Sequence, residues 1–239
     1  MNEQPKFEFH TSAGFAALND FRRVVLFMSY FFTALGKLSV IENAYVEEHP
    51  DDEDEQQLWV GWREHDQLLA ELVITRTADS FVSYLVDLLG LIYAERPEAL
   101  RSSEQERLDF ILQHADMPSL IHAIIEKRLE RLSYLSLQDL TKSVHEQLGF
   151  DLFTNENHFE RARELIEIRN VVVHNHGIVN RVSARKYPPF QNSLGRAIPM
   201  SHQQAGDHAQ FLLDQICTID KRAAAKFKLK KYDAGAAAF

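Results

Sequence analysis

Apolar residues recur at helical spacing along most of the chain. One stripe on a single helical face consists of Phe81, Leu85, Leu88, Leu89 and Ile92. A second stripe runs through residues 120–132. The chain has seven prolines and nine glycines, and most of them fall where a helical pattern stops. The pattern therefore predicts an all-α protein.

Start and stop residues divide this pattern into separate helices. We expect helices over about residues 16–45, 57–95, 103–114, 118–132, 136–149, 156–176 and 202–227. Ser136 and Asp139 have the spacing of a capping box, and Gly149 and Gly177 are typical helix stops. Residues 178–201 contain three prolines and are expected to be irregular.

The elements group into three segments of one compact domain. Residues 1–56 hold a long N-terminal helix and an acidic connector, and residues 57–180 form a helical bundle. Residues 181–239 add the irregular loop, a C-terminal helix and a Lys-rich tail. Inside the connector, residues 47–55 are too charged to pack, which favours a solvated linker over a metal site.

One apolar run resembles a membrane span in composition but not in length. Residues 24–35 read VVLFMSYFFTAL, twelve residues, whereas a span needs roughly twenty. We expect this helix to be buried against other helices or against a second subunit, with no membrane partner. The N-terminus lacks the basic and apolar regions of a secretion signal, so the expected compartment is the cytoplasm.

Charge is distributed unevenly along the chain. The formal net charge is −9, which on its own argues against a nucleic-acid partner. Residues 161–231, however, hold thirteen Lys or Arg against five Asp or Glu, a net charge of +8, so that the rest carries −17. A basic segment of this kind is typical of a polyanion-binding surface. Cys217 is the only cysteine, which excludes an intrachain disulfide and a Cys-based zinc site.

The candidate chemistry lies in the pattern Arg-Asn-x-x-Val-His-Asn-x-Gly, which begins at Arg169 and places a histidine at His174. This segment resembles the motif of HEPN domains (higher eukaryotes and prokaryotes nucleotide-binding), which are α-helical bundles. Residues from about 81 to 176 resemble the bundle of that family. Residues 1 to about 60 and those after about 180 have no clear counterpart in a minimal HEPN domain.

A β-hairpin is the competing interpretation of this segment. The run Val171 to Val173 has high β-propensity, and residues 175–177 are able to turn the chain into a second strand at 178–180. The preceding apolar residues Ala162, Leu165 and Ile166 continue in helical phase to Arg169, Val172, Val173 and His176. The resemblance favours the helix.

Helical geometry separates the two main candidate residues. At about 100° per residue, Arg169 and His174 point ~140° apart around one helix. Asn170 and His174 share a face, as do Arg169 and His176. Either the helix is distorted near its end, or a second subunit completes the site. The resemblance implies the second arrangement, with paired motifs in a cleft between the protomers of a homodimer.

The residue types then predict roles in RNA cleavage. A histidine has an unperturbed pKa near ~6.5 and is able to move a proton at neutral pH, and a guanidinium binds a phosphate. We expect His174 to transfer the proton, Arg169 to hold the phosphate and Asn170 to orient His174 or to bond a phosphate oxygen. The resemblance implies attack by the RNA 2′-OH, a 2′,3′-cyclic phosphate product and no metal or cofactor.

His176 departs from the family pattern, because related toxins often have Tyr at this position. Three interpretations are open: the second imidazole replaces the phenol as a proton donor or phosphate contact, the site is altered or inactive, or His176 only caps the helix end. Just past the motif, Arg181, Arg185 and Lys186 are candidate RNA-backbone contacts, with solvated loop charge as the alternative.

Three functions are therefore compatible with the sequence. The first is a HEPN-type endoribonuclease in a toxin–antitoxin or antiviral setting, with an antitoxin or regulatory protein as a possible partner. The second is a catalytically inactive HEPN-like module that binds RNA, nucleotide or protein. The third is a helical scaffold in which Arg169 and His174 have only structural contacts.

Overall fold

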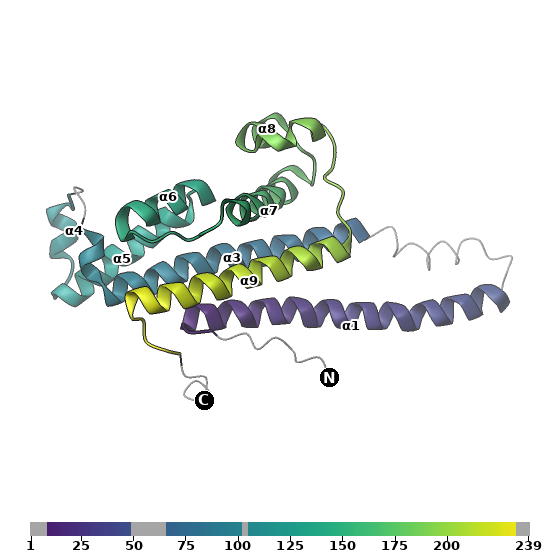
Figure 1. Ribbon diagram of the computed structural model, residues 1–239, viewed down its shortest axis with the longest axis horizontal. Coiled ribbons are helices and arrows are strands. Elements are labelled where there is room, and N and C mark those ends of the chain that lie inside the picture. Colours follow the sequence, from purple (N-terminus) through teal and green to yellow (C-terminus); the bar gives the residue numbers. More distant parts are fainter. Residues whose placement is uncertain (1–8, 49–65, 102–104, 233–239) are drawn as a thin grey trace. The chain divides into compact units, whose positions relative to one another are not determined.

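The computed structural model describes residues 9–48, 66–101 and 105–232 (Figure 1). These residues form the helices α1 (Ser12–Glu48), α3 (Asp66–Glu95), η2 (Pro97–Leu100), α4 (Leu108–Leu112), α5 (Met117–Ser133), α6 (Leu137–Leu148), α7 (Glu156–Asn175), α8 (Arg181–Lys186), η3 (Pro188–Ser193) and α9 (His202–Phe227). The β-structure among them is an isolated antiparallel bridge between Ile178 and Ala197. The all-α prediction is confirmed.

The chain folds into two compact units. Unit 1 consists of residues 1–18, 80–163 and 213–239, and unit 2 consists of residues 19–79 and 164–212. The unit boundaries fall inside α1, α3, α7 and α9. Of the boundaries expected from the sequence, the one after residue 180 lies between α7 and α8, and the one after residue 56 lies outside the described residues.

Unit 1 is built on the C-terminal half of α3. The predicted stripe is fully buried, with zero exposure for Phe81, Leu85, Leu88, Leu89 and Ile92. The amphipathic helix α6 buries Leu137, Leu140 and Val144. The end of α9 adds further buried apolar side chains, among them Ile216, Ile219 and Ala223. The apolar periodicity of the sequence thus identifies the core of this unit.

A buried carboxylate fixes the N-terminus of α1 within unit 1. Asp220 of α9 has no exposed surface and accepts hydrogen bonds from the backbone N–H groups of His10 (2.7 Å) and Thr11 (3.1 Å), and from the Thr11 hydroxyl. An added Cβ at Gly14 would lie 2.7 Å from the Asp220 Cγ, so only glycine permits this approach. The positive end of the helix dipole compensates the buried negative charge.

Helix ends in unit 1 follow the predicted caps closely. The Ser136 hydroxyl accepts from the Asp139 backbone N–H (3.1 Å) at the start of α6, and α6 ends at Gly149 in the left-handed conformation. The Asp139 carboxylate accepts from the Ser136 hydroxyl (2.6 Å) rather than from its backbone, so the capping box is not reciprocal. The helix expected from residue 103 begins at Leu108, and Ser102 and Ser103 lie outside the described residues.

Unit 2 packs the N-terminal half of α3 with the C-terminal half of α7. Its buried side chains include Leu69, Val73, Ile74 and Ala78 from α3, and Leu165, Ile168 and Val171 from α7. The inner face of α7 therefore continues from Leu165 through Ile168 to Val171. The sequence predicted that the apolar face of the helix continues to Val173. This is wrong, because the Val173 side chain is exposed.

The segment predicted to be irregular contains two short helices. Asn180 starts α8 by accepting hydrogen bonds from the backbone N–H groups of Val182 and Ser183, both at 2.9 Å. The rings of Tyr187 and Phe190 are buried and pack edge to face at 4.8 Å, which holds η3 beside α8. The prolines do not interrupt these helices, because α8 ends before Pro188 and η3 begins at it, where proline is tolerated.

Four large side chains in the apolar run of α1 are exposed. Val25, Leu26, Phe27 and Tyr30 are all exposed, Tyr30 by 74%. The expectation that this run is buried against other helices is therefore wrong for these side chains, and the second-subunit alternative stays a prediction.

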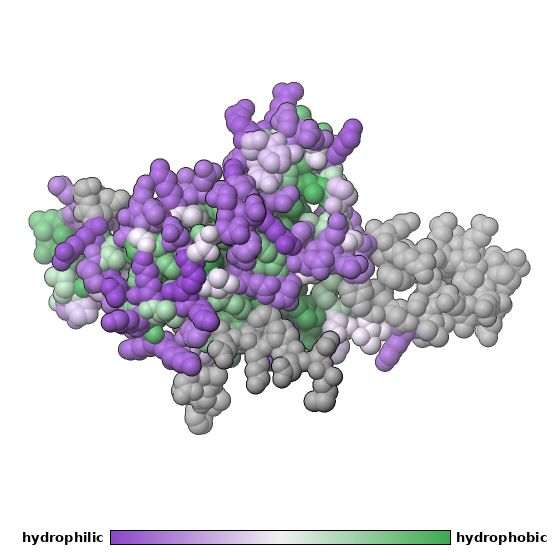
Figure 2. Space-filling view, in the orientation of Figure 1, coloured by the Kyte–Doolittle hydropathy of each residue, from purple (hydrophilic) through white to green (hydrophobic). Residues whose placement is uncertain are grey.

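Among the described helices, α3 is long and apolar enough to cross a membrane, but more than half of its apolar stretch is buried in the protein. Hydrophilic residues cover most of the face in Figure 2.

Candidate functional site

The motif occupies the last two turns of α7. The run Val171 to Val173 is helical, and α7 ends at Asn175. The next two residues, His176 and Gly177, have positive φ angles of 53° and 76°. The Gly177 N–H donates to the Val171 carbonyl (3.2 Å) and so closes the helix end.

The backbone after α7 excludes the alternative interpretation as a β-hairpin. The Val179 N–H donates to the Arg196 carbonyl (3.0 Å), and the Gly195 N–H donates to the Val179 carbonyl (2.8 Å). Residues 178–180 thus pair with a segment downstream of them and not with the valine run. The helical interpretation is confirmed.

Arg169 is half-buried and joined to two acceptors. Its Nη2 lies 2.7 Å from the Asp79 Oδ1 on α3, and its Nη1 donates to the Asn170 Oδ1 at 3.1 Å. The Nε atom is buried and has no acceptor among the described residues. A guanidinium has five N–H donors, so these contacts orient the group and leave donors available for a ligand.

Asn170 extends this polar chain to a second carboxylate. Its Nδ2 donates to the Glu167 Oε2 at 3.4 Å, and Glu167 is only 8% exposed. Asn170 therefore contacts Arg169 and Glu167 within this chain. The structure places no contact between Asn170 and His174, although the two share a face of α7.

His174 lies in a different environment from Arg169. Its side chain is exposed and makes no hydrogen bond or ion pair with any described residue. Because α7 stays helical through Asn175, no helix distortion brings His174 towards Arg169. The divergence of ~140° expected for an ideal helix therefore applies to this chain.

His176 lies beyond the helix. The prediction that it shares a helical face with Arg169 is wrong, because its φ of 53° takes the backbone out of the helix. Gly177 is required at the next position for two reasons. Its φ is positive, and an added Cβ would lie 3.1 Å from the Glu71 Oε1. A carboxylate of α3 therefore approaches the end of the motif.

A polar stripe on α3 runs beside the motif. Its members are Gln67, Glu71, Thr75 and Asp79, at four-residue intervals. Asp79 contacts Arg169, and eight residues earlier on α3 Glu71 lies beside Gly177, eight residues after Arg169, so α3 and the end of α7 run antiparallel here. The Gln67 Nε2 donates to the Glu71 Oε1 at 2.8 Å. The Thr75 hydroxyl is buried with no partner among the described residues.

This stripe was not among the sites predicted from the sequence. A signal was present, because Glu71 and Asp79 are charged residues eight positions apart in a helix with long apolar runs. Such residues face either solvent or a polar partner.

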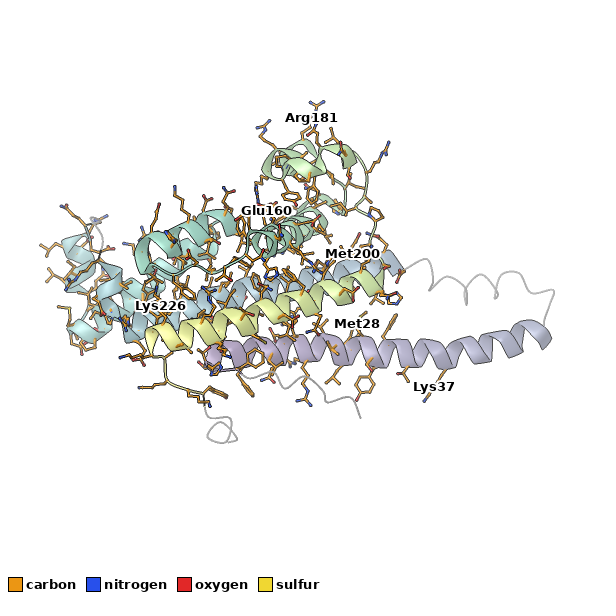
Figure 3. The ribbon with its side chains drawn as sticks, viewed as in Figure 1. Met28, Lys37, Glu160, Arg181, Met200 and Lys226 are labelled. Carbon is orange, nitrogen blue, oxygen red and sulfur yellow. The ribbon has the colours of Figure 1, made fainter. Side chains whose placement is uncertain are left out.

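The three cations after the motif lie on α8. Arg181, Arg185 and Lys186 are all exposed, and Arg181 projects from α8 in Figure 3. The Asn180 Nδ2 donates to the Asn175 Oδ1 at 2.7 Å and joins the start of α8 to the last residue of α7. The cations therefore follow the motif on a short rigid element rather than on an irregular loop.

Two chemical groups in this region are suited to phosphate chemistry. Arg169 provides an oriented cation, and His174 provides an accessible imidazole. No three His, Cys, Asp or Glu side chains converge as metal ligands in the described part of the chain. No family model, curated protein or solved structure matches this chain.

Proposed function

We propose that this protein is a metal-independent endoribonuclease of HEPN type. The observation that supports the proposal best is the contrast between two side chains on the last turns of α7. Arg169 is oriented by Asp79 and Asn170, while His174 is exposed and free of partners among the described residues. An oriented phosphate ligand and an accessible proton carrier are the two groups that cleavage by the RNA 2′-OH needs.

In this mechanism His174 takes the proton of the 2′-OH. The 2′-oxygen attacks the adjacent phosphorus, the bond from phosphorus to the 5′-oxygen breaks, and the leaving 5′-oxygen takes a proton from His176 or from water. Arg169 offsets the negative charge that grows on the phosphate oxygens. The products are a 2′,3′-cyclic phosphate and a 5′-OH. The ~140° separation of the two residues supports a homodimer in which each site combines groups from two copies of the motif.

The wider setting belongs to the same proposal. The resemblance of the motif supports a role in toxin–antitoxin or antiviral defence, in the cytoplasm, with an antitoxin or regulatory protein as partner. Arg181, Arg185 and Lys186 are proposed to contact the RNA backbone, and His176 to donate a proton or contact the phosphate.

RNA digestion in excess EDTA tests the chemistry. Wild type should cut single-stranded RNA to cyclic phosphate ends and leave DNA of the same sequence intact. Arg169→Ala and His174→Ala should each lower the cleavage rate on the order of 10²-fold or more, because each loses one of the two groups. Arg101→Ala and His122→Ala change exposed residues of unit 1 and should cut like wild type. Full cleavage by His174→Ala contradicts the assigned role.

A catalytically inactive binding module is the second candidate. It is favoured by the contacts of Arg169, which is already paired with Asp79 and Asn170 within its own chain. RNA binding by wild type and by both motif variants, with no cleavage by any of them, would decide for this candidate.

A further inference from the structure

The C-terminal end of unit 1 carries a concentrated positive charge. Residues 221–231 read KRAAAKFKLKK, with six Lys or Arg and no Asp or Glu. They cover the last turns of α9 and the segment that follows it. The sequence alone is equally compatible with lysines that only keep a tail soluble, so the geometry of these residues is decisive.

Two of the cations are fixed against the end of α6. Arg222 donates to the carbonyl oxygens of Asp151 (2.7 Å) and Leu152 (3.1 Å), and its guanidinium lies 5.0 Å from the centre of the Phe150 ring. Lys226, labelled in Figure 3, donates to the Gly149 carbonyl. With these residues, Ala225 and Asp151 line an open hollow of about 500 Å³.

Three other cations have no partner among the described residues. Lys221, Lys228 and Lys231 are exposed and make no hydrogen bond or ion pair there. Lys230 differs from them, because it lies 3.9 Å from Glu95. No described carboxylate forms an ion pair with these three lysines, so their charge is available to a ligand.

The segment after α9 is held in place at both ends. Lys228 has a φ of 55°, and the Leu229 N–H donates to the Ala224 carbonyl (3.2 Å), which closes the helix. Four residues after Lys228, the Tyr232 N–H donates to the His10 carbonyl (3.0 Å). The Tyr232 ring stacks on Phe15, with 4.7 Å between the ring centres. The lysines between these anchors are therefore presented on a fixed surface.

We propose that this surface binds the phosphate backbone of single-stranded RNA. We define it as the lysine ridge, formed by Lys221, Arg222, Lys226, Lys228 and Lys231. This inference rests on the proposed function and assigns the ridge to substrate binding in unit 1, separate from the motif in unit 2. A surface on which cations outnumber acids binds polyanions by releasing their counterions.

The apolar residues of the segment favour RNA over a lipid surface. Membrane-binding basic segments insert large apolar side chains next to their lysines. Here Phe227 is buried in the core of unit 1, at 6% exposure, and is not available for insertion. The largest apolar side chain of the segment is therefore not exposed beside the lysines, which favours a ligand that is held by charge.

The test measures binding separately from cleavage. A single-stranded 2′-O-methyl RNA keeps every phosphate but lacks the nucleophile, and fluorescence anisotropy follows its binding to the full chain between 50 and 200 mM salt. The ridge variant combines Lys221→Gln, Lys228→Asn and Lys231→Gln, since Asn tolerates the positive φ at position 228. The control variant combines Arg101→Gln, Arg107→Gln and Lys142→Gln, which removes the same charge from exposed positions of the same unit. Thermal unfolding followed by circular dichroism verifies that both variants fold.

The expected result is a weaker and less salt-dependent complex for the ridge variant only. Three lost phosphate contacts lower the slope of log K against log salt by about 2, which corresponds on the order of 100-fold in affinity at 0.1 M salt. The control variant should bind within about twofold of wild type. Equal binding by the ridge variant and wild type overturns the inference, as does binding to phosphatidylserine vesicles without binding to RNA.

These results are independent of the cleavage assay. If wild type binds through the ridge but does not cut RNA, the proposed function fails and the ridge stands. If wild type cuts RNA and the ridge variant binds normally, the ridge fails and the proposed function stands.

Discussion

The Arg169 guanidinium receives its orientation from another helix. Asp79 on α3 provides the acceptor at 2.7 Å, and Asn170 provides a second acceptor from α7. The ion pair is partly exposed, so its contribution to stability is small, at most about 1 kcal/mol. The main effect of this ion pair is on geometry, because a guanidinium that holds a phosphate must be placed accurately to assist a reaction.

At this scale we predict that Asp79→Asn slows RNA cleavage more than it weakens the fold. The variant keeps an oxygen acceptor but loses the charge that fixes Arg169. The cleavage rate should fall on the order of 10²-fold, while the affinity for 2′-O-methyl RNA stays within a few fold.

Asp20→Asn is the matched control, because Asp20 pairs with Arg76 at 3.1 Å in the same unit. Its cleavage rate should equal that of wild type. An equal loss in both variants would mean that Asp79 acts through stability alone, which urea unfolding of the two proteins would show.

The same residues mark the limit of what the sequence predicts. Arg169 and His174 were found from a local pattern of a few neighbouring residues. Asp79 lies 90 positions away from Arg169 along the chain, and only the packing of α3 on α7 brings the two together. The exposure of His174 and the burial of Glu167 likewise depend on which face of α7 turns inward. Three consecutive valines do not show which of them is buried, so the sequence did not identify that face.

Helices are predictable where their ends carry local signals. The bounds expected for α9, residues 202–227, are those observed, and α7 ends one residue before its expected end. Ser136 caps α6 as its spacing indicates. The short helix α8 was not predicted, although Asn180 and Ser183 have the spacing of a capping box. The three prolines of residues 178–201 outweighed this local signal in the sequence.

Replacing two glycines by alanine should change the stability of the protein in opposite directions. Gly177→Ala should destabilise the protein by about 1–2 kcal/mol, because its φ is 76° and an added Cβ would lie 3.1 Å from the Glu71 Oε1, which would have to shift slightly. Gly206→Ala lies inside α9 with nothing within 4 Å of the added Cβ, and should stabilise by roughly 0.5–1 kcal/mol.

Urea unfolding measures both changes in one experiment. Stabilisation by Gly177→Ala would contradict the end of α7 described above. Destabilisation by Gly206→Ala would contradict the open surface of α9 at that position.

The folded molecule as a whole should be sensitive to alkaline pH. Burial raises the pKa of the Tyr84 hydroxyl well above its usual value, and the negative charge of Asp220 adds to the effect. Burial likewise raises the pKa of Cys217 to about 12. Both groups are neutral when protonated, and the unfolded chain loses these protons at lower pH than the folded chain does. Their contribution to stability is complete below the unfolded pKa and is lost as pH rises towards the folded value.

We therefore predict that the free energy of unfolding falls from about pH 8.5 upwards, where an unfolded thiol begins to ionise. Tyr84→Phe should flatten this fall above about pH 10, where an unfolded tyrosine ionises. Tyr134→Phe changes an exposed side chain and should follow wild type. Urea unfolding at several pH values between 8 and 11 compares the three proteins. A fall of equal steepness in wild type and Tyr84→Phe would exclude Tyr84 as its source.

The backbone pairing around α8 has a consequence for which substitutions the protein tolerates. Val179 bonds to both Gly195 and Arg196, so main-chain hydrogen bonds join the two ends of the intervening segment. Of these residues Gly195 is the one that restricts the sequence, because its φ is 76°. The exposed positions of α8 should therefore accept substitutions while these hydrogen bonds, and the helix that carries Arg169 and His174, stay in place.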